Sequence, residues 1–194
     1  DRTMKILITT GVYPPEIPGP ATYTKMIEEH LPSRGYEVSV LPFSTVRHLP
    51  KIIRHLAYTV KCLQIARGVD IIFAQDPVSV GLPSLFAAKL LRKKFLLRLG
   101  GDYAWEQGRL RFGITAGLDQ FACGADGRYP MIVRILRRMQ SFVARRAVRV
   151  AVQSAQMKHV VACWGVSKDK LIVIPNGFDA PSNVPDKTSA RPTA

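Results

Sequence analysis

The sequence has no apolar run that approaches the roughly 20 residues of a membrane-spanning helix. Cysteine is also scarce: Cys62, Cys123 and Cys163 are far apart, odd in number and form no C-x-x-C pair. This spacing predicts free thiols that pack as small apolar residues in a reducing compartment. Because the histidines form no H-E-x-x-H motif and no apolar stretch of signal-peptide shape is present, we expect no bound metal and a cytoplasmic location.

The common phosphate-binding glycine motifs are absent as well. No G-x-G-x-x-G follows the first apolar run, and the second run ends in Leu-Pro-Phe-Ser-Thr, without an acid to bind a ribose hydroxyl. These absences disfavour a nicotinamide-dependent dehydrogenase. No G-x-x-x-x-G-K-[ST] sequence is present either, which excludes a P-loop nucleotidase.

Acidic residues are few: 14 Asp and Glu stand against 28 Lys and Arg, a net charge of +14. None occurs from Val38 to Val69 or from Gly127 to Lys168. Such a surface attracts anions, which include phosphorylated ligands, anionic lipid and nucleic acid. Because no zinc finger or RNA-recognition signature is present, nucleic acid is not an expected partner.

What is present is an alternation of strand-like and helix-like patterns. Strand character occurs at Met4–Thr10, Glu37–Pro42, Asp70–Ala74, Phe95–Leu99, Arg149–Gln153 and Leu171–Ile174. Helical patterns lie between them at Ala21–Ser33, Pro50–Arg67, Ser79–Arg92, Pro130–Ala147 and Ala155–Trp164. Several strands are apolar on both faces, which is typical of a parallel sheet covered by helices. The sequence therefore predicts an α/β fold with a Rossmann-like, doubly wound parallel sheet flanked by helices.

Two segments depart from this rhythm. The segment Gly100–Tyr129 is glycine-rich with little periodicity, which predicts a long functional or mobile loop. Asn176 and the glycine after it predict a turn and a candidate hinge. The chain beyond it is rich in proline, serine and threonine, so we expect one domain over 4–179 and a linker over 180–194 that leads to a further domain.

Ligands of an open parallel sheet bind beyond the carboxyl ends of its strands, so the segments after the strands hold the candidate residues. Gly19 and Pro20 would open a helix whose free N–H groups suit a phosphate or carboxylate, although Pro18 and its neighbours could equally shape a turn. Asp76 is either a binding carboxylate or, more commonly for an Asp before proline, a turn and helix cap.

The fourth predicted strand leads into the stretch RLGGDYAWEQG. Gly101 lets the backbone turn, and Asp102 and Glu106 then offer carboxylates beside Tyr103 and Trp105. Carboxylates next to aromatic rings suit polyol ligands, whose hydroxyls and C–H faces they match. The alternative is a helix cap with a buried tryptophan.

Three stretches, in their order and spacing, resemble the N-terminal domain of group 1 (family 4) retaining glycosyltransferases of the GT-B fold: MKILITTGVYPPEIPGPATYTKMIEEHLPSRGYEVSVL, RLGGDYAWE and KLIVIPNGFD. The resemblance covers nearly all of Met4 to Asp179. In that family two Rossmann-like domains face each other, the first binding the acceptor and the second the nucleotide-sugar. The resemblance implies transfer, with retention and without metal, to a lipid-linked or polysaccharide acceptor. It also implies that this half alone is inactive.

The resemblance also assigns roles to residues. Pro18 and Gly19 match the family's glycine-rich loop near donor phosphate and acceptor, although a proline has no N–H to donate. Many relatives place a histidine near the reacting sugar after the fourth strand, and here that role falls to Asp102 as the catalytic residue. The expected substrate-binding residues are Pro18, Gly19, Asp76, Gly101, Tyr103, Glu106 and Asn176.

Two other readings stay open. One is a non-catalytic module that binds anionic surfaces, and the other is a GT-B-fold sugar-nucleotide epimerase. In either case the basic segments predict peripheral attachment to anionic membrane, through the helix at Lys51–Arg67 or that at Arg134–Arg146. Apolar residues such as Leu56 and Tyr58 would dip into the interface. The alternative is that these arginines are the solvated faces of helices whose apolar stripes pack on the core.

Overall fold

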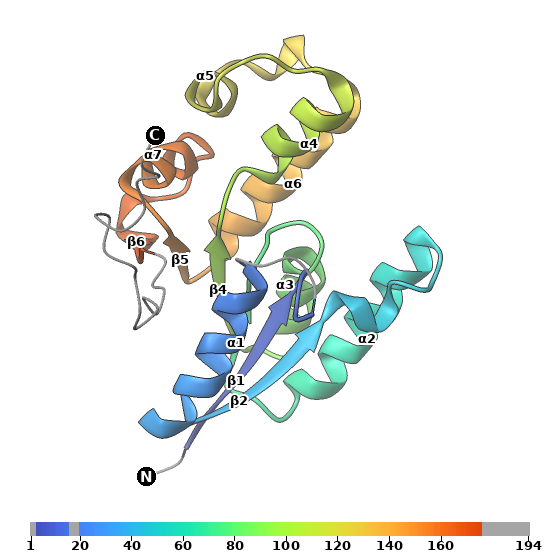
Figure 1. Ribbon diagram of the computed structural model, residues 1–194, viewed down its shortest axis with the longest axis vertical. Coiled ribbons are helices and arrows are strands. Elements are labelled where there is room, and N and C mark those ends of the chain that lie inside the picture. Colours follow the sequence, from blue (N-terminus) through green and yellow to red (C-terminus); the bar gives the residue numbers. More distant parts are fainter. Residues whose placement is uncertain (1–2, 16–19, 176–194) are drawn as a thin grey trace, which may run out of the picture.

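The fold of the chain is a single parallel sheet between helices, as seen in a computed structural model that describes residues 3–15 and 20–175 (Figure 1). The strands are β1 (Met4–Thr10), β2 (Tyr36–Pro42), β3 (Ile71–Ala74), β4 (Lys94–Leu99), β5 (Arg149–Val152) and β6 (Leu171–Val173). Their order across the sheet is β2-β1-β3-β4-β5-β6, and every pairing is parallel. The predicted doubly wound α/β fold is confirmed, because all six predicted strands form within one residue of their expected bounds.

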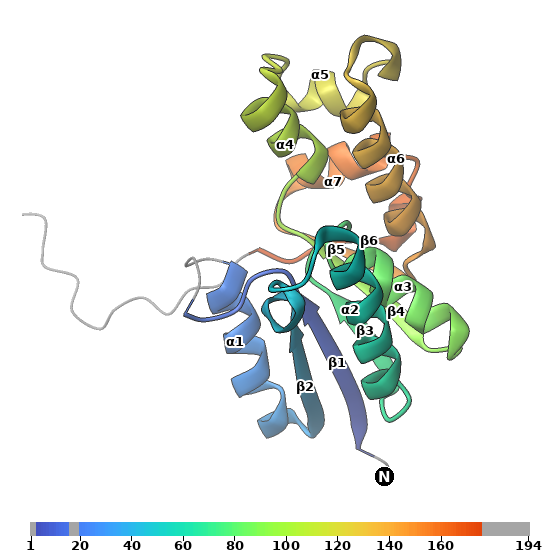
Figure 2. The ribbon, with the colours of Figure 1, turned by 90° about the vertical axis from the view of Figure 1, so that its right-hand side faces the viewer.

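Helices connect the strands. Those of the described residues are α1 (Pro20–His30), α2 (Lys51–Ala66), α3 (Gly81–Leu90), α4 (Tyr103–Phe112), α5 (Leu118–Cys123), α6 (Met131–Arg146) and α7 (Ala155–Cys163), with short 3-10 turns at Pro32–Arg34, Phe43–Val46, Asp126–Arg128 and Lys168–Lys170. Helix α1 covers one face of the sheet, and α2 and α3 lie side by side on the other (Figures 1 and 2). Within this part of the chain, no helix combines the length and hydropathy that crossing a bilayer requires.

The main core lies between the sheet and these helices. Its strands contribute fully buried residues such as Leu7, Ile72 and Leu97. Tyr58 of α2 is buried with them, and its hydroxyl donates to the carbonyl of Leu41 at 2.7 Å. The prediction that Tyr58 could dip into a membrane is therefore wrong, because the core takes up its ring.

The segment between β4 and β5 is the main departure from the predicted fold. It is not a long loop: α4 and α5 form within it and stand beyond the carboxyl ends of the strands (Figure 1). These helices and the start of α6 share a second, small core made of Ala104, Phe121, Tyr129 and Val133. Arg137 of α6 adds to it by stacking on Phe121 and Tyr129, at 4.7 and 5.3 Å from the ring centroids.

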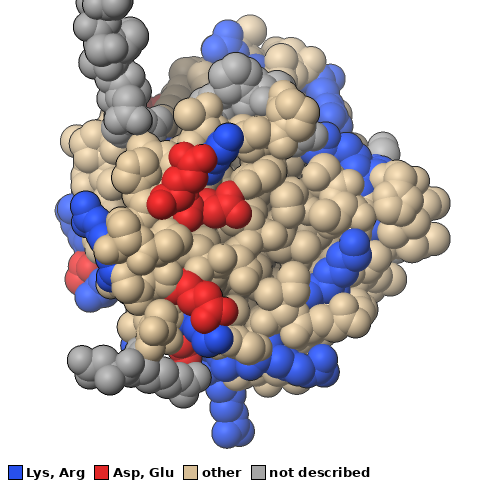
Figure 3. Space-filling view, turned by 60° about the horizontal axis from the view of Figure 1, so that its bottom comes forward, with Lys and Arg blue, Asp and Glu red and all other residues tan. Residues whose placement is uncertain are grey.

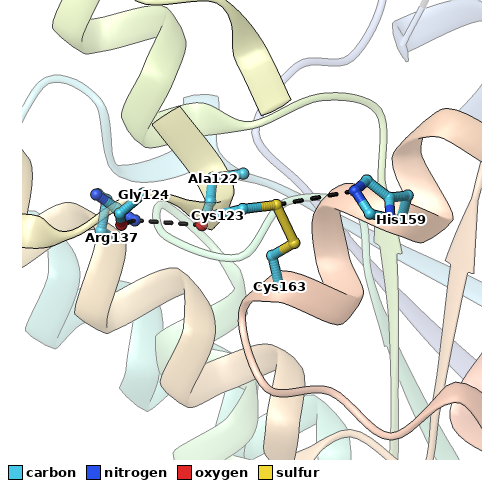
Figure 4. Close-up of a disulfide and its surroundings, with 6 residues drawn as sticks. All are labelled: Ala122, Cys123, Gly124, Arg137, His159 and Cys163. Carbon is cyan, nitrogen blue, oxygen red and sulfur yellow. Dashed lines mark hydrogen bonds between the residues drawn. A yellow bond between two sulfur atoms is a disulfide. The ribbon is translucent and has the colours of Figure 1, made fainter. Parts of the chain in front are cut away.

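The cysteines also differ from expectation. Cys123 at the end of α5 and Cys163 at the end of α7 form a disulfide that joins the inserted helices to the sheet body (Figure 4). Sequence spacing could not predict it, because 40 residues separate the two and only the fold brings them together. Cys62 alone matches the prediction of a buried free thiol.

Candidate functional site

A cavity of about 470 Å³ opens at the carboxyl edge of the sheet, where ligands of open α/β folds bind. Its walls come from the segments after four strands: Thr10, Gly11 and Val12 after β1, Gln75, Asp76, Pro77 and Ser79 after β3, Arg98, Gly100, Gly101, Tyr103 and Glu106 from β4 onward, and Gln153 after β5. The strand order brings these segments together, since β1, β3, β4 and β5 are consecutive neighbours in the sheet.

The two carboxylate oxygens of Asp76 have different surroundings. One oxygen, Oδ1, accepts hydrogen bonds from the backbone N–H groups of Val78, Ser79 and Val80 at 2.9, 2.6 and 3.3 Å. This is the turn that the sequence offered as the commoner role, but it is not a helix cap, because the N-cap of α3 is Val80 and no side chain caps that helix. The other oxygen, Oδ2, lies against Gly11, where an added Cβ would approach it to 2.8 Å. Burial raises the pKa of Asp76, and the three N–H donors oppose that rise.

Glu106 reaches back over the turn that precedes its own helix. Its Oε1 lies so close to Gly101 that a Cβ at that position would collide with it. The carboxylate of Glu106 thus occupies space that a side chain at position 101 would take, and a substitution there would displace the end of the Glu106 side chain. The pKa of Glu106 is raised by partial burial and then by the negative charge of Asp102. The cavity wall thus holds two carboxylates, those of Asp76 and Glu106, and each lies against a glycine.

Asp102 lies beneath the cavity and not in its wall. It is only 1% exposed and is the N-cap of α4, where its Oδ1 accepts from the N–H of Trp105 at 3.0 Å. The same oxygen accepts from Gln140 Nε2 at 2.8 Å, and Gln140 Oε1 accepts from the N–H of Ala104 at 3.0 Å. Burial raises the pKa of Asp102, against the effect of the Gln140 hydrogen bond. Asp102 and Gln140 together fix the helix that carries Glu106.

Arg98 supplies positive charge to the same cavity. Only 5% of the residue is exposed, and its guanidinium stacks 3.6 Å from the ring centroid of Tyr23 on α1. Burial lowers the pKa of Arg98, but an arginine begins so far above neutrality that it keeps its charge. A cation held on an aromatic face at the end of β4 would favour an anionic or hydroxyl-rich ligand.

Gln75 was missed by the sequence analysis. It follows β3 directly and lines the cavity, yet its amide oxygen and nitrogen are both buried and make no hydrogen bond among the described residues. An unsatisfied buried amide costs about 1–3 kcal/mol per group, and such groups in native proteins are commonly satisfied by a ligand or water. A signal for it existed, because glutamine is the first residue after both β3 and β5, at Gln75 and Gln153.

The predicted site residues therefore divide into three groups. Asp76, Gly101, Tyr103 and Glu106 come together in the cavity wall, and their binding roles stay predictions. The prediction that the Asp102 side chain lines the cleft is wrong, because the cap of α4 holds it below the surface, while its importance for catalysis stays a prediction. Pro18, Gly19 and Asn176 lie outside the described residues.

Charge is unevenly spread over the surface. On the face in Figure 3, acidic side chains gather left of the centre, and lysines and arginines lie beside them and around the edges. Within the described residues, the ion pairs of Lys5 with Glu37 and of Lys25 with Glu29 are exposed or partly so. Exposed pairs of this kind contribute little to stability.

Comparison with known proteins identifies the family. The model of Glycosyltransferase Family 4 matches residues 17–180, which is most of the chain. The chain therefore belongs to Glycosyltransferase Family 4, and the family resemblance inferred from its motifs is confirmed. No curated protein matches the sequence.

Solved structures share the fold at low sequence identity. The lipopolysaccharide outer core galactosyltransferase WaaB, in its apo form, is 13% identical with a TM-score of 0.59, over 95% of this chain and 50% of that one. The UDP-GlcNAc 2-epimerase from Methanocaldococcus jannaschii is 11% identical with a TM-score of 0.58, over 88% of this chain and 45% of that one. This chain thus spans about half the length of these relatives and has the fold of one half of a GT-B enzyme.

Proposed function

We propose that the chain is the acceptor-side half of a glycosyltransferase that moves a sugar from a nucleotide-sugar to a lipid-linked or saccharide acceptor, with retention of configuration and without a metal, in polysaccharide biosynthesis. Membership of Glycosyltransferase Family 4 supports the transferase class. The observation that carries the site is the cavity at the carboxyl edge of the sheet, where two carboxylates, a buried amide and an arginine converge.

The side chains of the cavity match the needs of a sugar. Asp76 and Glu106 present carboxylate oxygens that accept hydrogen bonds from hydroxyl groups, and the amide of Gln75 can both donate and accept. Tyr103 adds an aromatic ring against which the C–H face of a sugar can pack. Arg98 would balance negative charge that the donor phosphate brings to the cavity.

We expect Asp102 to act on turnover through the helix that it caps. Its carboxylate holds the first turn of α4, which carries Tyr103 and Glu106 into the cavity wall. A shift of about 1 Å in such groups can cost about a hundredfold in rate. This role is one of positioning, and it differs from direct contact with the reacting sugar.

The test is transfer by the full-length protein. Radiolabelled UDP- and GDP-sugars are offered with a polyprenyl-diphosphate-linked saccharide, with a free oligosaccharide or with no acceptor, and the labelled products and released nucleotide are separated. We expect transfer with one class of acceptor and none by the 194 residues alone. Transfer by these residues alone, or nucleotide-sugar turnover that never labels an acceptor, would contradict the proposal.

An epimerase is the second candidate, because UDP-GlcNAc 2-epimerases are among the solved structures with this fold. The same assay separates the two activities. An epimerase converts UDP-GlcNAc into its 2-epimer when no acceptor is present, whereas a transferase leaves the sugar unchanged until an acceptor is added. Analysis of the recovered nucleotide-sugar by NMR therefore decides between them.

We further propose peripheral attachment to the cytoplasmic face of an anionic membrane through α2. Ile53, Leu56 and Val60 are all more than half exposed and, at spacings of three and four, lie on one face of the helix. Arg67 is exposed just beyond the end of the helix, and no acid occurs from Val38 to Val69. Apolar side chains flanked by basic ones suit the interface of an anionic leaflet. A membrane-bound enzyme would meet a lipid-linked acceptor at its surface.

A further inference from the structure

The disulfide between Cys123 and Cys163 has a histidine beside it (Figure 4). Nε2 of His159 lies 3.9 Å from Sγ of Cys123, and the three potential ligand atoms all lie within 4.8 Å of one another. All three residues are exposed, so reductants and metal ions can reach them. Two cysteines and a histidine in one cluster form a set of ligands that zinc prefers.

The local geometry suits a metal as well as a disulfide. His159 and Cys163 are four residues apart on α7, so their side chains lie on the same side of one helical turn. Cys123 approaches them from the end of α5. Tetrahedral zinc binds sulfur at about 2.3 Å and nitrogen at about 2.0–2.1 Å, which places neighbouring ligand atoms about 3.5–4 Å apart. The separation of Cys123 and His159 already falls in this range.

The charges around the cluster favour thiolates. Arg137 donates to the carbonyls of Ala122 and Gly124, on either side of Cys123, at 3.2 and 3.1 Å. Arg138 and Arg145 line the adjoining cavity of about 400 Å³ together with both cysteines, and its lining includes no acidic side chain among those that the structure describes. Nearby guanidinium groups stabilise a thiolate relative to a thiol. Two thiolates then neutralise a divalent cation, so the site needs no carboxylate.

We propose that Cys123, His159 and Cys163 form a redox-switched zinc site. In the oxidised protein the two sulfurs are joined. A dithiol reductant transfers two electrons and two protons to this disulfide, which gives two thiols and leaves the reductant as its own disulfide. Zn²⁺ then displaces the two thiol protons and is bound by two thiolates and the His159 imidazole, with water as the fourth ligand.

Either state ties the same two parts of the fold together. The disulfide and the zinc complex both join the end of α5 to α7, and α5 belongs to the inserted helices that carry Tyr103 and Glu106. Only the reduced, metal-free form lacks this cross-link. The cluster would thus keep the inserted helices in place under oxidising conditions and, where zinc is available, under reducing conditions.

Cobalt(II) tests the proposal, because it takes the place of zinc and is coloured. The protein is reduced with a phosphine, transferred to metal-free buffer and titrated with Co²⁺. We expect one Co²⁺ per chain, a thiolate-to-cobalt charge-transfer absorption and the visible bands of a tetrahedral ion, all lost on adding Zn²⁺. The oxidised protein should give none of these bands. Their absence from the reduced protein would overturn the proposal.

Variants separate the metal site from the disulfide. His159→Gln leaves both cysteines, so we expect the disulfide to form but the reduced protein to bind Co²⁺ at least about tenfold more weakly, since even outer-shell partners are worth that much. Cys163→Ser should lose both the disulfide and the charge-transfer band. The matched controls are His30→Gln, an exposed histidine on α1, and Cys62→Ser, the buried free cysteine. Unchanged Co²⁺ affinity in His159→Gln, or loss of affinity in the controls with circular dichroism unaltered, would contradict the assignment.

Discussion

The sheet body and the inserted helices between β4 and β5 are held together in different ways. The body has a core to which every described strand contributes, so its stability is spread over many apolar contacts. The insertion has a core of four buried residues and depends on a few specific contacts: the Asp102–Gln140 clamp, the stacked Arg137 and the disulfide. Since the insertion supplies Tyr103 and Glu106, one part of the wall of the candidate site rests on the region with fewer supports.

The largest effect is expected in the body. Leu97 in β4 is fully buried in the main core, and Leu97→Ala should lower the free energy of unfolding by about 4 kcal/mol, through lost apolar burial and the cavity left behind. Urea denaturation followed by circular dichroism measures it. A loss below about 1.5 kcal/mol would mean that the body is less tightly packed than this account requires.

The disulfide should have a slightly smaller and more local effect. Its 40-residue loop corresponds to about 3–4 kcal/mol of stabilisation in the chain-entropy model, so metal-free Cys163→Ser should lose about that much. Because this loss lowers global stability, the slowest amides of the sheet should also exchange faster, and the amides of α4 and α5, whose local opening the disulfide restrains in addition, should accelerate more. Equal acceleration in β1 and β3 would break the distinction between the two regions.

Two variants of Asp102, the N-cap of α4, distinguish the effect of its charge from that of its hydrogen bonds. Asp102→Ala should cost about 2–3 kcal/mol, since it removes the cap and leaves the donors of Trp105 and Gln140 unsatisfied. Asp102→Asn keeps an oxygen acceptor for both donors and should cost little. In the full-length enzyme, Asp102→Ala should lower kcat far more than its loss of folding stability explains. Asp102→Asn should keep most of the kcat and most of the free energy of unfolding. Near-normal turnover in both variants would exclude Asp102 from catalysis.

These variants also carry a pH dependence with a defined sign. Burial raises the pKa of Asp102 above its ordinary value of 3.8, so the folded state binds this proton more tightly than the unfolded state. The resulting stabilisation is complete below that ordinary value and is lost as pH rises through the raised pKa. Asp102→Asn lacks this loss, so its stability relative to the natural protein should increase with pH. A difference that stays flat from acid to neutral pH would contradict the raised pKa.

The smallest expected effect is on liposome binding, which we expect to depend on α2 of the sheet body and not on the inserted helices. Arg67→Gln in the body should weaken co-sedimentation with anionic liposomes at low salt by about fivefold, which is ~1 kcal/mol per basic residue near the surface. Arg111→Gln, an exposed arginine at the end of α4, is the matched control from the insertion and should change nothing. Equal binding to neutral liposomes, or equal losses in the two variants, would contradict attachment through α2.

The sequence predicted the body better than the insertion for a physical reason. Strands such as Ile71–Ala74 are apolar on both faces, one buried and the other half-buried, so a short window of sequence contains the signal. Helix α4 has little apolar periodicity and is fixed by distant partners such as Gln140, and the cysteine pair is joined only through the fold. Periodicity also predicted α6, but it could not show that Gln140 is fully buried and Ile132 exposed.

The candidate site was predicted in part for the same reason. The rule that ligands bind at the carboxyl edge located Asp76, Gly101 and Glu106 without any knowledge of their contacts. It could not distinguish Glu106 in the wall from Asp102 beneath it, because that difference depends on how α6 packs against α4. Nor did it find Gln75, whose significance lies in a buried amide without a partner.

Gln75→Leu tests most directly the claim that the cavity at the carboxyl edge is the sugar site. Leucine removes a buried amide that has no hydrogen-bond partner among the described residues, so the melting temperature should stay the same or rise. If the amide binds the substrate, kcat/KM for transfer in the full-length enzyme should fall at least about tenfold, the worth of 1.4 kcal/mol. Stability kept and turnover lost is the predicted result, whereas unchanged kcat/KM in a stable Gln75→Leu protein would contradict the assignment of this cavity.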